Sequence, residues 1–251
     1  MKLKAYAKIN LCLKVFPKTT NFKHPIDSIF FLYKKLFDKI KVKKSNKLEI
    51  IYKNKNLDYH IEKQLIIRLL TYLQNKYDLN INYKFVIYKK IPYGSGLGSS
   101  SNVVAKIMNF ILFKTKNIII DLKEIALQFG SDIPFFLSGL NIARVFGYGE
   151  NVVPIYNWKP KPKIHLNSYK TFSKDVFAKL DKDVNYQSSV DVDMFIKQKL
   201  YKHLSNSQSI NNNDLTKYII RNNARLGDEI KKYGPNAFFT GAGSTIVTIK
   251  E

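Results

Sequence analysis

The chain has 251 residues, of which 45% are hydrophobic, so it can bury the core of one large or two small globular domains. Its formal net charge is +23, but only four of its 42 basic residues are arginines and the lysines are spread along the whole chain. This pattern favours a solvated basic surface over a dedicated nucleic-acid face. The single cysteine, Cys12, excludes an intramolecular disulfide, and the sequence has no run of about eighteen apolar residues to span a membrane. We therefore expect a soluble cytoplasmic protein.

Hydrophobic periodicity predicts strands and helices in the first part of the chain. Apolar residues that alternate with polar ones predict strands, at residues 2–16, 28–43, 80–90 and 141–146. Apolar residues at helical spacing predict helices, at residues 61–77 and 100–113. Asp121 is suited to cap a third helix, DLKEIALQFG, which Gly130 would end.

Three prolines and the sole tryptophan, Trp158, interrupt the chain between residues 151 and 166. Such a change in composition is typical of a domain boundary, so we predict one domain over residues 1–155 and a second over residues 156–251. In the second domain we expect a strand at 163–168, a short helix near 174–181, a polar helical stretch ending near 232 and a closing strand at 238–250.

The stretch PYGSGLGSSS, residues 92–101, joins a predicted strand to a predicted helix. Glycine permits positive φ and a close approach of the backbone to a ligand, and the free N–H groups in the first turn of a helix attract anions. The loop therefore predicts a phosphate site made of backbone donors. Ser99, Ser100 and Ser101 can add hydroxyls for phosphate oxygens or for magnesium.

Three well-known nucleotide-binding loops fit these residues less well. A Walker loop requires a lysine after its glycines, and none follows here. In a dinucleotide-binding fold the third glycine would stand where Ser99 stands, and some ninety residues precede the loop, so this fold is a weak runner-up. A protein kinase would need a strand lysine, a catalytic loop and a DFG triplet, which are absent from the sequence. A flexible turn without a ligand remains an alternative.

Three further segments accompany the loop: AKINL at 7–11, GSDIPFFLSG at 130–139 and TGAGST at 240–245. Together with the loop they resemble the GHMP kinases, small-molecule kinases named for galactose, homoserine, mevalonate and phosphomevalonate. The resemblance implies a two-domain α+β fold, with an N-terminal mixed sheet and helices for nucleotide binding and catalysis and a smaller C-terminal ferredoxin-like α/β domain for substrate binding. It implies ATP and Mg²⁺ as cofactors. The protein ligands of magnesium, and the choice between a monomer and a homodimer, stay open.

Within this family, AKINL and GSDIPFF most resemble the branch that phosphorylates the 2-hydroxyl of a cytidine-diphosphate-linked sugar alcohol, diphosphocytidyl-methylerythritol, in non-mevalonate isoprenoid biosynthesis. The resemblance implies that Lys8 and Asp132 act on the hydroxyl. The chemistry agrees, because a carboxylate can accept the proton of an alcohol while a neighbouring ammonium offsets the charge that builds on the phosphoryl group. Taken singly, Lys8 is explained as a surface lysine and Asp132 as a helix cap.

The resemblance also implies binding residues. Those expected at the nucleotide are Lys89, Pro92, Gly94, Ser95, Gly96, Leu97, Gly98, Ser99, Ser100 and Ser101. Those expected at the alcohol and its cytidine are Asn10, His24, Phe177, Thr240 and Gly241. This chain departs from the family pattern at Lys23, where a tyrosine is usual and for which Phe22 could compensate, and at Gln64, which replaces an asparagine near the adenine.

Two alternative functions remain at this point. A mevalonate-type or homoserine-type kinase would share the loop and the Lys8 and Asp132 pair but would have no need of His24 and Phe177. A basic nucleic-acid-binding protein on a kinase scaffold would show an affinity that falls steeply with salt.

Overall fold

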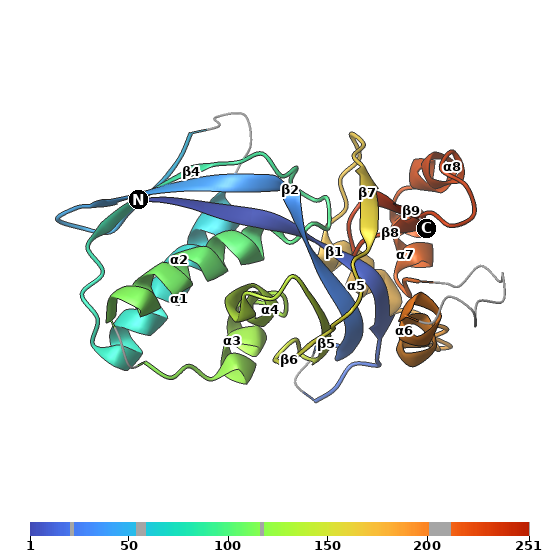
Figure 1. The fold of residues 1–251 in the computed structure, drawn as a ribbon, viewed down its shortest axis with the longest axis horizontal. Coiled ribbons are helices and arrows are strands. Elements are labelled where there is room, and N and C mark those ends of the chain that lie inside the picture. The colour runs from blue at the N-terminus through green and yellow to red at the C-terminus, as the bar shows by residue number, and fades with distance from the viewer. Residues whose placement is uncertain (21–22, 54–58, 116–117, 201–211, 251) are drawn as a thin grey trace.

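A computed structural model describes residues 1–20, 23–53, 59–115, 118–200 and 212–250 (Figure 1). The elements of the N-terminal part are β1 (Lys2–Val15), β2 (Ile26–Lys44), β3 (Glu49–Tyr52), α1 (His60–Tyr77), β4 (Tyr83–Tyr88), α2 (Ser99–Thr115), α3 (Leu122–Phe129), α4 (Ile133–Ser138), β5 (Ile142–Gly147) and β6 (Asn151–Pro154). Those of the C-terminal part are β7 (Lys161–His165), α5 (Ser173–Leu180), α6 (Val192–Leu200), α7 (Thr216–Asn222), α8 (Arg225–Lys231), β8 (Phe238–Phe239) and β9 (Ile246–Lys250).

The larger sheet is organised around β2, which pairs with β1, β4 and β5. Strand β3 runs parallel to β4 and the remaining pairs are antiparallel, which confirms the expected mixed sheet. Strand β1 buries Ala5, Ala7 and Ile9. Register shifts between Tyr6 and Ala7 and between Asn10 and Cys12 interrupt the pairing of β1 with β2. Such irregularities turn side chains in new directions and are common beside active sites.

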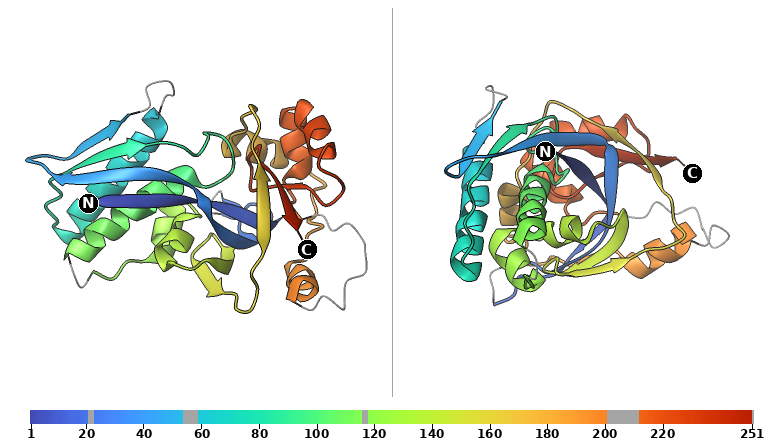
Figure 2. Two further views of the ribbon diagram at one scale, coloured as in Figure 1. Left: turned by 45° about the horizontal axis from the view of Figure 1, so that its top comes forward. Right: turned by 60° about the vertical axis from the view of Figure 1, so that its left-hand side comes forward.

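The helices of the N-terminal part cover one face of this sheet. Figures 1 and 2 show α1 and α2 side by side there, and α2 buries most of its length. The helix predicted from Asp121 is confirmed as α3, because the Asp121 carboxylate accepts hydrogen bonds from the N–H groups of Lys123 and Glu124 at 2.8 and 3.1 Å. The sequence does not predict the four-residue strands β3 and β6 or the six-residue helix α4, since segments this short show little periodicity.

The C-terminal part contains a smaller antiparallel sheet with the strand order β7, β9, β8. The structure confirms this smaller sheet, which has three strands in the part of the chain described. The closing strand predicted at 238–250 is wrong as one element, because the glycine turn at 240–245 divides it into β8 and β9. Hydrogen bonds that Lys217 and Tyr218 donate to Asp183 tie α7 to the turn after α5, and they lower the pKa of Asp183 to about 2.

One contact between the two parts of the chain lies at the end of β1. The Val15 N–H donates to the Asp214 carboxylate at 2.9 Å, and Leu13 forms an isolated bridge with Asn213. Leu215 and Tyr218 pack into the same buried cluster as Leu13. The division at residue 155 stays a prediction. None of the helices in the described ranges is long and apolar enough to cross a membrane.

Candidate active site

The structure brings together Lys8 and Asp132, which are 124 positions apart in the sequence. The Lys8 Nζ lies 3.3 Å from Asp132 Oδ2, with side chains that are 5% and 24% exposed. The ammonium also donates to Asn10 Oδ1 and lies 4.8 Å from the centre of the Phe30 ring. Lys8 is therefore no surface lysine. Asp132 precedes α4, but its side chain makes no capping hydrogen bond, so the helix-cap interpretation fails as well.

Alternation along β1 explains why Lys8 and Asn10 act together. Residues two apart on a strand point to the same face, and here that face looks toward α4 and the glycine turn at 240–245. The Asn10 backbone N–H donates to Thr240 Oγ1 at 2.8 Å, and its side-chain amide donates to Ser28 Oγ at 2.9 Å. A Cβ added to Gly241 would lie 3.4 Å from Lys8 Nζ. The predicted residues Asn10 and Gly241 thus lie at the Lys8 ammonium, and Thr240 bonds to the Asn10 backbone beside it.

The glycine loop packs directly against the second glycine turn. Gly94, Gly96 and Gly98 have φ angles of +74°, +78° and +68°, which favour glycine. A Cβ at Gly96 would lie only 2.3 Å from the Thr240 carbonyl oxygen. These three glycines are half-buried, so their backbone groups remain partly accessible, as a phosphate site requires.

The same loop is hydrogen-bonded to β1, the strand that carries Lys8. The Lys8 N–H donates to the Leu97 carbonyl at 2.9 Å, and a Cβ at Gly98 would lie 2.8 Å from Lys8 Cγ. Leu97 and Ser95 are buried, whereas Pro92 is half-buried. The backbone of the loop and the Lys8 ammonium therefore lie close together.

Three of the residues expected at the nucleotide have carboxylate partners within the protein. The ammonium of Lys89 lies 2.9 Å from Asp38 Oδ2 and 2.8 Å from Glu62 Oε2, and its side chain is 3% exposed. The hydroxyls of Ser99 and Ser100 donate to the same two carboxylates. A buried ammonium needs paired anions more than solvent contact. Ser101 Oγ lies elsewhere, 3.6 Å from a Cβ added to Gly130.

The expected cytidine residues form a second cluster. The rings of His24 and Phe177 are 5.3 Å apart and inclined by 33°. His24 Nδ1 lies 2.8 Å from the Phe16 carbonyl, and Nε2 lies 2.7 Å from Asp181 Oδ1. Partial burial acts to raise the pKa of Asp181, but hydrogen bonds from Lys18 and His24 outweigh it and hold that pKa below its ordinary value. None of the sequence motifs points to Asp181.

The side chains at the two departures from the family pattern, Lys23 and Gln64, both contact nearby residues. Lys23 donates to the carbonyls of Ala126 and Leu127 near the end of α3, and burial lowers its pKa. It therefore stabilises a helix end and does not replace an aromatic ring. Gln64 lies on α1 and contacts His60. Phe22 lies outside the described residues.

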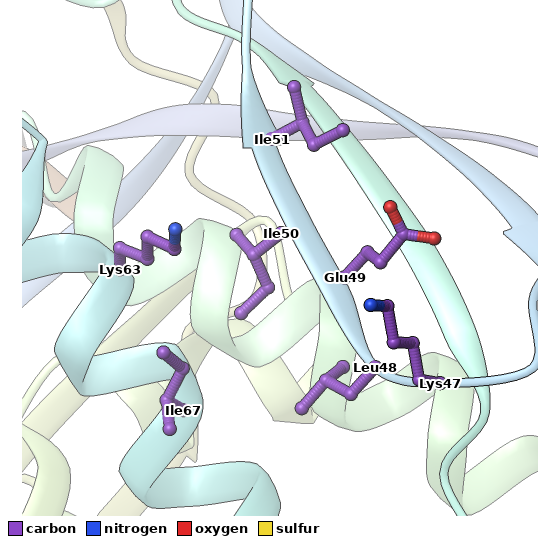
Figure 3. Close-up of a pocket in the computed structure, with 7 residues that line it drawn as sticks. All are labelled: Lys47, Leu48, Glu49, Ile50, Ile51, Lys63 and Ile67. Carbon is purple, nitrogen blue, oxygen red and sulfur yellow. The ribbon is translucent and has the colours of Figure 1, made fainter.

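A surface pocket of about 520 Å³ lies between β3 and α1, as Figure 3 shows, lined by Lys47, Leu48, Glu49, Ile50, Ile51, Lys63 and Ile67. It contains no residue of the glycine loop or of the Lys8 and Asp132 pair. We place the site at that pair because a paired acid and base beside accessible backbone donors can perform chemistry, whereas this pocket offers mostly aliphatic walls and lysine stems.

The side chains present fit a magnesium ion that is held chiefly by phosphate. Among the described residues, no group of three or more His, Cys, Asp or Glu could hold a metal ion. Magnesium commonly takes only one or two protein ligands and completes its octahedron with substrate phosphates and water. The Ser100 hydroxyl directs its proton at Glu62, so lone pairs of its oxygen remain available for a cation.

Comparison with known proteins identifies relatives of this chain. The family model described as GHMP kinases N terminal domain matches residues 64–140. A Ureaplasma parvum protein named 4-diphosphocytidyl-2-C-methyl-D-erythritol kinase is 31% identical over 258 residues, covering 100% of this chain and 96% of that protein.

Two solved structures show the same fold. A crystal structure of 4-(cytidine 5'-diphospho)-2C-methyl-D-erythritol kinase matches with a TM-score of 0.75 at 20% identity, over 100% of this chain and 90% of that one. Homoserine kinase from Cytophaga hutchinsonii matches with a TM-score of 0.56 at 16% identity, over 100% and 84%. With a full-length relative at 31% identity and the site described above, the chain belongs to the GHMP kinase family.

Proposed function

We propose that this GHMP kinase transfers the γ-phosphoryl group of ATP to the 2-hydroxyl of 4-diphosphocytidyl-2-C-methyl-D-erythritol. The observation that carries the proposal is the pairing of Lys8 Nζ with Asp132 Oδ2 at 3.3 Å, beside a loop of half-buried glycines with positive φ angles. The Ureaplasma parvum relative bears the name of this kinase, which supports the choice of substrate.

The arrangement suits an in-line phosphoryl transfer. Backbone N–H groups of the loop at 94–98 and of the first turn of α2 hold the triphosphate. Asp132 accepts the proton of the hydroxyl, whose oxygen attacks the γ-phosphorus while the bond to the bridging oxygen breaks and ADP leaves. The Lys8 ammonium offsets the negative charge on the transferred group. The Ser100 oxygen would help to hold a magnesium ion, which would supply positive charge to the phosphate oxygens.

The distance between the two clusters favours an elongated acceptor. His24 contacts Phe16, just beyond the end of β1, whereas Lys8 lies near the middle of that strand. The stretch from Lys8 to Val15 spans at most roughly 23 Å, at ~3.3 Å per residue. A compact alcohol at Asp132 would leave the His24 and Phe177 rings unused, whereas an alcohol linked through a diphosphate to cytidine could reach both clusters.

A coupled assay of ADP release tests the proposal. ATP is supplied with 4-diphosphocytidyl-2-C-methyl-D-erythritol, mevalonate or homoserine, and we expect turnover with the cytidine-linked alcohol alone. Phe177→Ala should raise the KM for this alcohol about tenfold or more, because aromatic stacking on a base is worth about 1–3 kcal/mol. The matched control, Phe113→Ala, removes a ring that is 75% exposed on α2 and should leave KM unchanged. Preferential turnover of mevalonate or homoserine would refute the proposed substrate.

A further inference from the structure

Beneath the glycine loop lies a buried polar network that the mechanism above uses only at Ser100. Asp38 comes from β2 and Glu62 from α1, whereas Lys89 directly follows β4, and Ser99 and Ser100 start α2. The side chains of Asp38, Glu62 and Lys89 are 0%, 1% and 3% exposed. Buried charges of this kind are costly unless each is paired and hydrogen-bonded, so their contacts indicate what the network holds in place.

The contacts of Asp38 connect the two ends of the loop. Its Oδ1 accepts the backbone N–H groups of Lys90 and Ile91 at 2.6 and 2.9 Å, just before the loop. Its Oδ2 accepts the Ser99 hydroxyl, just after the loop, and pairs with Lys89 Nζ at 2.9 Å. One carboxylate thus fixes the chain where it enters and where it leaves the glycine turn.

Glu62 supports the same ammonium from the other side. Its Oε2 accepts Lys89 Nζ at 2.8 Å and the Ser100 hydroxyl at 2.7 Å, and its Oε1 accepts the Tyr52 hydroxyl at 2.8 Å. Burial, followed by the charge of Glu62, raises the pKa of Tyr52, so this phenol stays a donor. These bonds of Glu62 all come from side chains, whereas Asp38 also accepts two backbone N–H groups, and this difference separates their roles.

We propose that Asp38 is a positioning residue for the nucleotide, which holds the backbone donors of the 92–98 loop and the first turn of α2 in the geometry that binds phosphate. In this arrangement Lys89 is the buried counter-ion of Asp38 and Glu62 and contacts no phosphate itself. The inference rests on the proposed binding of ATP at this loop. It adds a residue whose effect is on nucleotide affinity and not on the hydroxyl.

Two isosteric substitutions distinguish a positioning role of Asp38 from a purely electrostatic one. Asp38→Asn leaves one acceptor oxygen for four donors: two N–H groups, the Ser99 hydroxyl and the Lys89 ammonium. Glu62→Gln is better tolerated, because the amide oxygen can serve Lys89 and Ser100 while the amide N–H₂ donates to the Tyr52 oxygen. Each change removes one negative charge, so a purely electrostatic role would affect both variants equally.

Calorimetric titration with magnesium and the non-hydrolysable analogue β,γ-imido-ATP measures the effect without turnover. We expect Asp38→Asn to raise Kd at least about tenfold, since hydrogen bonds to charged groups are worth about 1.5–3 kcal/mol, and Glu62→Gln to raise it less than about threefold. Asp228→Asn, which removes an exposed acid on α8, is the control and should leave Kd unchanged. A partly unfolded sample lowers the number of binding sites, whereas a displaced loop raises Kd.

The outcomes discriminate between this inference and the proposed function. An unchanged Kd in folded Asp38→Asn, or equal losses in the two variants, would overturn the positioning role alone. No binding of the analogue by the wild-type chain would overturn both proposals. If Asp38→Asn does not fold, Ser99→Ala can be used, because it removes one hydrogen-bond donor to Asp38 while it keeps every charge. This variant should raise Kd about threefold to tenfold. The KM for the alcohol should stay within about twofold in all these variants, which general loosening of the fold would not produce.

Discussion

The substitution Asp132→Asn tests the catalytic assignment with little change in shape. The amide oxygen that replaces the carboxylate can still accept a hydrogen bond from Lys8, but the amide cannot accept the proton of the alcohol. A positioned general base contributes about 10²- to 10⁴-fold, which is about 3–5 kcal/mol of transition-state free energy. The Asp132 side chain is 24% exposed and makes no capping hydrogen bond, so we expect a loss of only about 1 kcal/mol in the free energy of unfolding.

The assay compares kcat for the cytidine-linked alcohol with the stability of each variant in urea. Asp132→Asn should lower kcat by at least about a hundredfold while the Kd for the ATP analogue stays within about threefold. The control Asp121→Ala should behave in the opposite way, because it removes the α3 cap, costs about 1 kcal/mol of stability and leaves kcat near the wild-type value. A kcat for Asp132→Asn within about tenfold of the wild-type value would refute the role of this carboxylate.

Three further predictions concern the residues around the site and the C-terminal part. Lys8→Met should lower kcat about a hundredfold or more, and the double variant with Asp132→Asn should be little worse than either single one, because groups that act as a unit are not additive; multiplied losses would contradict this. Gly96→Ala should abolish binding of the ATP analogue or the fold itself, because the φ angle of +78° and the nearby carbonyl oxygen exclude a Cβ, so a normal Kd and melting temperature would count against the packing described. Asp183 has a pKa lowered to about 2 in the folded chain, so its stabilisation is present above about pH 4 and disappears as the pH falls toward 2; the melting temperatures of wild type and Asp183→Asn should converge over that range.

The catalytic pair can be predicted because short motifs carry it. AKINL and GSDIPFF place Lys8 and Asp132 in segments with recognisable neighbours, and the second glycine turn at 240–245 lies against the same strand. Periodicity cannot give the distance between the two side chains, since β1 and α4 meet only through long-range packing. The structure supplies that distance of 3.3 Å.

Asp38 and Glu62 of the buried network escape sequence reasoning because they look like surface residues. Asp38 stands in the run LYKKLFDKIKVKK, where charged residues alternate with apolar ones as on a solvent-facing strand. Glu62 and Lys89 likewise occupy polar positions in or next to predicted elements. One signal is that Asp38 is the only acid between Asp27 and Glu49 in a lysine-rich stretch. Periodicity assigns a residue to a face, but it cannot show that distant elements cover that face.

Sequence reasoning also does not predict the carboxylate partners of three residues expected at the nucleotide. Lys89, Ser99 and Ser100 flank the glycines, which favours a role at the ligand, but each has a carboxylate partner inside the protein. The structure does show the backbone conformation that is expected of the glycines. Gly94, Gly96 and Gly98 all have the positive φ angles that a glycine-rich anion loop needs.

The most direct test of the central claim is a crystal structure of the ternary complex with β,γ-imido-ATP, magnesium and 4-diphosphocytidyl-2-C-methyl-D-erythritol. The account predicts that the phosphates lie on the backbone of the 94–98 loop and that the 2-hydroxyl lies between Asp132 and the γ-phosphorus, about 3–3.5 Å from the latter. The cytosine should lie against His24 and Phe177. A triphosphate bound away from this loop, or a hydroxyl out of reach of Asp132, would contradict it.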